Sequence, residues 1–92
     1  MTKQEAIDLE SETDKLFSEK LETDCEVSMA LTGALRISVD GGFFNIKTAT
    51  QVVDWVKWNG DYEVLQDYIN KAKLVIEENE EKIDLLMQSY RN

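Results

Sequence analysis

The chain has 92 residues, with nineteen acidic and ten basic side chains, one cysteine, and neither histidine nor proline. Its formal net charge of −9 at pH 7 disfavours direct binding of nucleic acid or of an anionic membrane and favours basic partners. The missing histidine removes the usual general base and the commonest metal ligand, and a lone cysteine excludes an internal disulfide. We therefore expect a single domain over residues 1–92, in a reducing cytoplasm, with no enzyme activity, cofactor or metal.

The first 26 residues predict a helix with one apolar and one acidic face. Thr2 and Glu5 have the spacing of a capping box, which marks a helix start. At 100° per residue, the apolar positions Leu9, Leu16, Phe17 and Leu21 share one half of the helical wheel. Six carboxylates form an acidic stripe centred opposite this half: Glu5, Asp8, Glu12, Glu19, Glu22 and Glu26. Three further carboxylates lie off the stripe, at Glu10, Asp14 and Asp24.

Residues 27–47 change to the period of two that is typical of strands. Apolar residues occupy odd positions from Val27 to Val39, and this parity continues through Gly33. We therefore predict one long strand that bends at Gly33 without a turn. The glycines after Asp40 then predict a tight hairpin with a return strand at 43–47. A two-residue loop at either Asp40-Gly41 or Gly41-Gly42 would place Phe44 and Ile46 on the same face as Ile37 and Val39.

A short apolar helix is expected next, and a long helix after it. Thr48 and Gln51 have capping-box spacing, and the apolar residues that follow include Trp55 and Trp58, which we expect in the core and not as exposed partner anchors. Asn59-Gly60 would end this helix, and Asp61 would cap the last one. The predicted fold class is α+β: an N-terminal helix, a β-hairpin, then a short and a long C-terminal helix, in the order αββαα.

The last helix has a heptad seam, in which the spacing alternates between three and four residues: Tyr62, Leu65, Ile69, Ala72, Ile76, Asn79, Ile83, Leu86 and Tyr90. Twenty-nine helical residues would be roughly 43 Å long, which is more than so small a domain can cover. Either the helix breaks near Glu77–Glu81 and folds back, or its end packs on another chain. We predict a homodimer with its interface at Ile76, Asn79, Ile83, Leu86 and Tyr90, because a second copy would cover both the end of this helix and the unpaired edge of the strand that begins at Val27.

Six acidic residues face away from this seam, Glu63, Asp67, Glu77, Glu78, Glu81 and Asp84, and the last four form a second acidic group. Carboxylates one helical turn apart are about 6 Å apart, close to the phosphate spacing along a nucleic-acid strand. A protein that recognises phosphates with Lys and Arg could accept such rows in place of a duplex backbone. The alternative is an ordinary solvated helix face, but such faces usually mix signs to reduce repulsion. We therefore predict that the acidic stripe and this group bind a basic nucleic-acid-binding protein.

Length, acidity, lack of histidine and the order of elements resemble small acidic phage proteins that counter host defence, of which the Arn-type anti-restriction DNA mimics are the nearest type. The parts that match are the stripe from Glu5 to Glu26 and the cluster Glu77–Asp84, because such mimics share a charge layout and no signature motif. The resemblance implies an inhibitor that occupies the DNA-binding cleft of a restriction or defence protein in the host cytoplasm. Two alternatives remain: a helical assembly or adaptor protein that dimerises through the seam, and an immunity-like toxin inhibitor.

Overall fold

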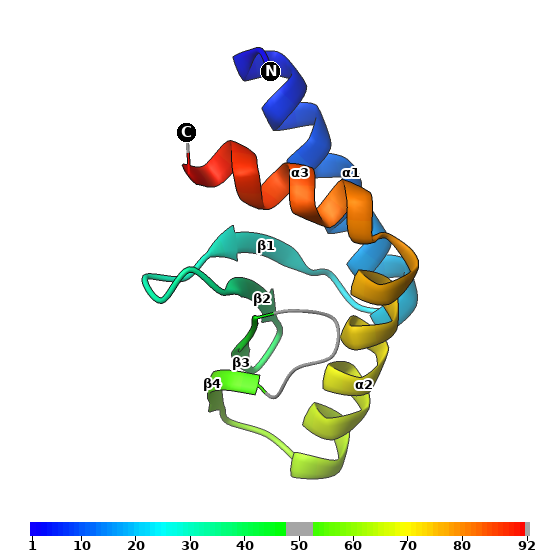
Figure 1. Ribbon diagram of the computed structural model, residues 1–92. Coiled ribbons are helices and arrows are strands. Elements are labelled where there is room, and N and C mark those ends of the chain that lie inside the picture. Colours follow the sequence, from blue (N-terminus) through cyan, green and yellow to red (C-terminus); the bar gives the residue numbers. More distant parts are fainter. Residues whose placement is uncertain (48–52, 92) are drawn as a thin grey trace.

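The computed structural model describes residues 1–47 and 53–91, with the backbone alone for residues 53–55. The elements in chain order are α1 (Lys3–Leu21), β1 (Glu26–Met29), β2 (Leu35–Val39), β3 (Gly42–Ile46), β4 (Val53–Trp58), α2 (Tyr62–Glu78) and α3 (Glu80–Arg91). The strands form one antiparallel sheet in the order β1-β2-β3-β4, and the helices pack along one side of it (Figure 1). The α+β class is confirmed, while the predicted order αββαα is corrected to αββββαα.

Helix α1 begins where the sequence predicts. Thr2 Oγ1 accepts a hydrogen bond from the Glu5 amide at 3.1 Å, and the Thr2 amide donates to Glu5 Oε1 at 3.2 Å, which completes the capping box. Phe17 and Leu21 lie buried in the core. The helix ends at Leu21, because Glu22 adopts a left-handed φ of 59° as the C-cap. The chain then turns toward β1, so the helix is shorter than the 26 residues expected.

The prediction of one long bent strand is wrong, because a turn at residues 30–34 separates β1 from β2. Gly33 has a φ of 88°, and its amide donates to the Ala30 carbonyl at 2.9 Å. Val27 pairs with Ile37, and Met29 pairs with Leu35. Because the turn contains an odd number of residues, odd positions stay on the core face on both sides of it. The parity of the sequence therefore cannot distinguish this hairpin from a bent strand.

The hairpin at Asp40-Gly41 is confirmed. Val39 pairs with Gly42 across a two-residue loop, and Ile37 pairs with Phe44, so both sides of the hairpin bury their apolar residues on one face. Gly41 has a φ of 106°, which a side chain rarely adopts. Gly42 lies against β4, where a Cβ would overlap the backbone carbonyl of Lys57. The glycine pair therefore serves both the turn and the close approach of β4.

The prediction of a short helix after residue 48 is wrong for the part of that segment that the structure describes. Val53–Trp58 is strand β4, which pairs with β3. Its β-branched and aromatic residues favour a half-buried pleated surface over a helix. The expected cap at Thr48 and Gln51 and the side chain of Trp55 lie outside the described residues. Trp58 is half-buried beside the core, and its ring meets the edge of Tyr68 at a centroid distance of 5.9 Å.

Of the two alternatives for the last helix, the break is confirmed. Asn79 separates α2 from α3 with φ and ψ of −130° and 37°. Its side-chain Nδ2 donates to the Val75 carbonyl at 2.9 Å, and its own carbonyl accepts from the Ile83 amide at 2.9 Å. The polar residue in the seam thus ends one helix and starts the next.

The predicted dimer interface lies inside the single chain. Ile76, Ile83 and Leu86 are buried in its core, and Asn79 bonds to its own helix. The fifth residue, Tyr90, packs against the core and donates its hydroxyl to Glu10 Oε2 at 2.7 Å. As a consequence, the seam binds the sheet and α1 of its own chain, and the length argument for a homodimer no longer applies.

Two side chains cover the outer edge of β1, which the sequence left without a partner. The Val27 amide donates to Asp14 Oδ1 of α1 at 2.8 Å. The Tyr90 hydroxyl of α3 lies 3.5 Å from the Val27 carbonyl oxygen. Edge strands with free backbone groups invite pairing with other chains. Here the helices satisfy that edge at its second residue, so the open-strand argument for a second copy is also lost.

Candidate functional site

The predicted acidic stripe is exposed along its whole length, but it is only partly helical. Glu5, Asp8, Glu12 and Glu19 are exposed on α1, where the wheel placed them. Glu22 is the C-cap, and Glu26 belongs to β1. Glu26 pairs with Ser38, on the sheet face opposite the buried Val27 and Ile37. The last residue of the stripe therefore leaves the helical surface, which is a correction to the sequence prediction.

Packing of α1 against α2 and α3 joins the middle of the stripe to the second acidic group. Lys20 Nζ lies 3.3 Å from Glu78 Oε1, and Lys82 Nζ lies 3.3 Å from Glu12 Oε2. Glu19 and Glu78 also line one shallow groove between α1 and α2. These contacts bring Glu12, Glu19 and Glu78 near one another, and Glu77, Glu81 and Asp84 are exposed on the same two C-terminal helices. We call these six carboxylates together the acidic surface.

Two lysines reduce the charge of the acidic surface without neutralising it. Lys20 and Lys82 each pair with one of its six carboxylates across the helix interface. Ion pairs this exposed contribute between 0 and about 1 kcal/mol to stability. Lys15 lies one helical turn from Glu12 and Glu19, and Lys73 lies one turn before Glu77, so the six carboxylates exceed the neighbouring lysines by two. The acidic surface therefore remains negative and attracts cations.

The outward face of the sheet carries Arg36 and Lys57 beside Glu26 and is close to neutral in its described side chains. Arg36 and Lys57 project from it, since they pair with Asn45 and Phe43 and alternate with the buried core residues. The Arg36 guanidinium lies 4.0 Å from the centroid of the Phe43 ring, and its Nε donates to Asn45 Oδ1 at 3.1 Å. The net negative charge is thus concentrated on the helical side of the molecule.

A second carboxylate cluster lies where the end of α1 meets the start of α2, and it joins acidic residues that the sequence analysis had placed in separate rows. Its groove is lined by Glu22, Asp61, Glu63 and Asp67, together with Lys71. Lys71 Nζ is 2.9 Å from Asp67 Oδ2, and this pairing raises the pKa of Lys71 above its usual value. Asp61 and Glu63 also serve the helix start, because Asp61 Oδ1 accepts from the Glu63 amide at 2.9 Å. The sequence did contain a signal for this cluster. Acidic residues lie at the end of the first helix and at the start of α2, and antiparallel packing brings these two ends together.

The off-stripe carboxylates on α1 have structural roles. Asp14 and Glu10 bond to Val27 and Tyr90 at a site that we call the β1 junction; it consists of Glu10, Asp14, Ser18, Cys25, Val27 and Tyr90. Burial raises the pKa of Asp14 despite its bond to the Val27 amide. Burial likewise raises the pKa of Cys25 to about 11 and raises that of Tyr90.

Within residues 1–47 and 53–91, no group of three or more His, Cys, Asp or Glu side chains has a geometry that would hold a metal ion. No helix in these ranges is long and apolar enough to cross a membrane. The acidic surface can attract, orient and pair with cationic groups, and its described side chains include no nucleophile paired with a base. No protein-family model matches the chain, and no curated protein or solved structure shows significant similarity to it.

Proposed function

We propose that this chain is a non-catalytic inhibitor whose acidic surface occupies the basic, nucleic-acid-binding cleft of another protein. The observation that carries the proposal is the meeting of acidic segments from different helices: Glu19 of α1 shares a groove with Glu78 of α2, and Glu12 of α1 pairs with Lys82 of α3. A single acidic helix offers one row of charges. Two adjoining rows offer a surface, as the two strands of a duplex do.

The mechanism needs no chemistry beyond electrostatics. Opposite charges steer the two proteins together quickly, and the bound inhibitor then excludes the nucleic acid from the same cleft. Such binding weakens steeply with salt, because exposed charges are screened over about 8 Å at physiological ionic strength. In this proposal the protein acts in the cytoplasm of the cell that contains its target, which is the host if the chain is phage-encoded.

Competition for immobilised DNA tests the proposal. Bacterial cytoplasmic proteins are bound to a duplex-DNA column at about 50 mM salt, and the purified chain is applied as competitor. We expect it to release one or a few DNA-binding proteins that bovine serum albumin, another acidic protein, leaves on the column. The released protein and the chain should then form a complex that dissociates as salt rises toward about 200 mM.

Charge-matched variants locate the binding region. Glu19→Lys with Glu81→Lys reverses two charges of the acidic surface, and Asp24→Lys with Asp40→Lys changes the net charge equally at exposed positions elsewhere. Release should drop at least about tenfold for the first pair, which is about 1.4 kcal/mol of binding free energy. The second pair should retain release. Equal loss in both variants would show that only the overall charge matters, and the acidic surface would not be the binding site.

The proposal takes one chain as the binding unit. Both the adaptor alternative and the homodimer require the heptad seam as an interface. Ile76, Ile83 and Leu86 of that seam are buried in the chain's own core. Light scattering at micromolar concentration should therefore give a mass near 10.6 kDa. A mass of twice that value would restore the homodimer.

A further inference from the structure

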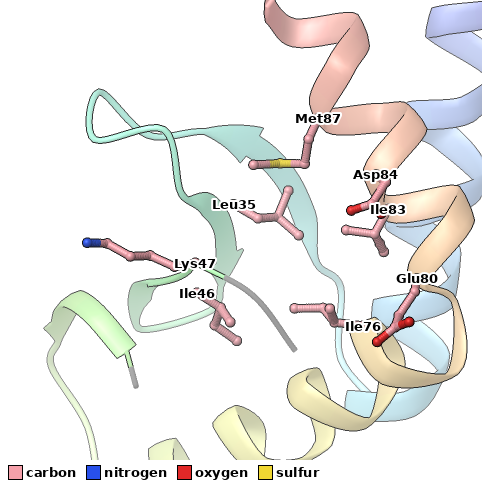
Figure 2. A pocket seen from close by; sticks show the side chains of 8 residues that line it. All are labelled: Leu35, Ile46, Lys47, Ile76, Glu80, Ile83, Asp84 and Met87. Atoms are coloured by element: carbon pink, nitrogen blue, oxygen red, sulfur yellow. The ribbon is translucent and has the colours of Figure 1, made fainter. Parts of the chain in front are cut away.

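The break between α2 and α3 leaves a cavity at the end of the acidic surface. Its volume is about 240 Å³, and it lies between the sheet and the two helices (Figure 2). Leu35 and Ile46 line it from the sheet, while Ile76, Ile83 and Met87 line it from the helices. All five side chains are buried or nearly so, so the floor of the cavity is apolar.

The rim of this cavity on the helix side is negative. Glu80 and Asp84 are four residues apart on α3, which places them on one face of that helix, and both are exposed. In Figure 2 both carboxylates lie at the cavity on its helix side, and Lys47 lines it on the sheet side with its side chain directed outward. A group that enters the cavity therefore meets an apolar floor, with two carboxylates on the helix side of the entrance and one lysine on the sheet side.

We infer that this cavity binds one large apolar side chain of the protein partner, from a segment in which that side chain is next to Lys or Arg. The inference rests on the proposed function and adds the chemistry of the partner. The volume of the cavity is below the roughly 300–1,000 Å³ of typical small-molecule sites, and this size suits a single side chain. The carboxylates select a cationic neighbour by charge complementarity, and Asp84 lies one helical turn after the exposed Glu81 on α3.

Such an anchor would explain how an electrostatic inhibitor gains specificity. Exposed charges pair with many cationic surfaces and are screened by salt. A side chain buried in a pocket contributes a term that depends on shape and persists at high salt. The cavity therefore separates the intended partner from other basic proteins.

Three capped tripeptides test the inference, with binding followed by amide chemical shifts of the labelled full chain. Lys-Phe-Arg should shift the amides of Ile46, Lys47, Ile83 and Asp84 more than those elsewhere. Lys-Ala-Arg has the same charge without the anchor and should bind at least about fivefold more weakly, a difference of roughly 1 kcal/mol. Glu-Phe-Glu has the anchor with the wrong charge and should produce no localised shifts.

Two variants test the residues themselves. Glu80→Gln with Asp84→Asn should weaken Lys-Phe-Arg binding at least about threefold, since it removes both rim charges. Glu63→Gln with Asp24→Asn removes the same charge at exposed positions away from the cavity and should leave binding unchanged. Ile83→Phe adds a ring that can occupy the cavity, so the protein should fold, with dispersed amide signals, and lose its preference for Phe over Ala.

The inference is overturned if Phe and Ala peptides bind equally, if Glu-Phe-Glu shifts the same amides, or if the rim variant retains full affinity. These results leave the proposed function untouched, because its test measures release of proteins from DNA. Conversely, a chain that binds Lys-Phe-Arg in the cavity but releases nothing from the DNA column would keep the site and disprove the mimicry.

Discussion

The acidic surface and the β1 junction use the same residue type, from the same helix, for opposite purposes. Glu12 and Glu19 extend from α1 into solvent, whereas Asp14 and Glu10 turn toward β1 and α3. The exposed pair adds little to stability, because water screens its interactions. The inward pair holds a strand edge and a helix end in place. The number of carboxylates in α1 therefore says less about function than the face on which each one lies.

Titratable groups concentrate at the β1 junction for a physical reason. Asp14, Cys25 and Tyr90 lie close together in a partly dehydrated region, and burial raises the pKa of each. Each group therefore favours its neutral form in the folded protein more than in the unfolded chain. Protonation state and stability are therefore coupled at this junction. The pH dependence of stability can distinguish the β1 junction from the acidic surface.

Alkaline pH should have the largest effect on the β1 junction. A thiol or phenol whose folded pKa is raised stabilises the protein fully below its unfolded pKa, and that stability is lost as pH rises through the folded pKa. For Cys25 the window runs from about 8.5 in the unfolded chain to about 11. For Tyr90 it starts near pH 10. Each group lowers the free energy of unfolding by at most about 1.4 kcal/mol per pH unit, so we expect the melting temperature to fall steeply above pH 9.

The control for this titration is Cys25→Ser combined with Tyr90→Phe, which removes both titrating groups with little change in shape. Its melting temperature should be lower at pH 7 but should depend less on pH between 9 and 11. If both proteins lose stability in parallel over this range, other groups, such as the lysines, cause the alkaline effect.

Asp14→Ala should have the next largest effect. It leaves the Val27 amide without its acceptor on a partly buried edge, which costs about 1–3 kcal/mol. Asp14→Asn keeps an acceptor and removes the charge that burial disfavours, so it should cost less than the alanine variant. Urea unfolding at pH 7 measures both. Equal losses for Ala and Asn would mean that the charge, and not the hydrogen bond, holds the junction together.

Tyr90→Phe tests the other half of the β1 junction. It removes the hydroxyl that donates to Glu10 Oε2 at 2.7 Å and keeps the ring against the core. We expect a loss of about 1 kcal/mol, which is typical of one hydrogen bond. Combined with Asp14→Ala, it also uncovers the Val27 edge, and light scattering should then detect association that the single-chain protein does not show. A double variant that stays monomeric would show that other features protect this edge.

The regular periods of the sequence predicted the first helix and the hairpin of β2 and β3, and each error elsewhere has a physical cause. The capping box at Thr2 and the hairpin at Asp40-Gly41 depend on neighbouring residues, so the sequence alone sufficed. The turn at Gly33 was missed because a loop with an odd number of residues preserves strand parity. Strand β4 was taken for a helix because a short apolar run fits either structure, and its pairing with β3 decides between them.

The acidic site was predictable in part. The helical wheel correctly identified exposed carboxylates on α1, since exposure follows from the opposite apolar face. It could not show that Glu12 and Glu78 each meet a lysine from another helix, because these contacts depend on how the helices pack. For the same reason the cavity beside Asp84 had no signal in the sequence. Asn79 was recognised as a possible break, but its hydrogen bonds were needed to confirm it.

The smallest effect should come from the acidic surface itself. Glu19 is exposed, and Lys20 beside it already pairs with Glu78. Glu19→Lys removes repulsion from the neighbouring carboxylates of α1 and introduces a cation near Lys20, so the two changes nearly cancel. We expect the free energy of unfolding to change by less than about 0.5 kcal/mol, the usual size of one exposed charge interaction on a helix. Urea unfolding at low and high salt measures this change, and salt should reduce it further. A loss above about 1 kcal/mol would exceed what an exposed pair supplies; Glu19 would then be structural, like Asp14, and the contrast between the two regions would fail.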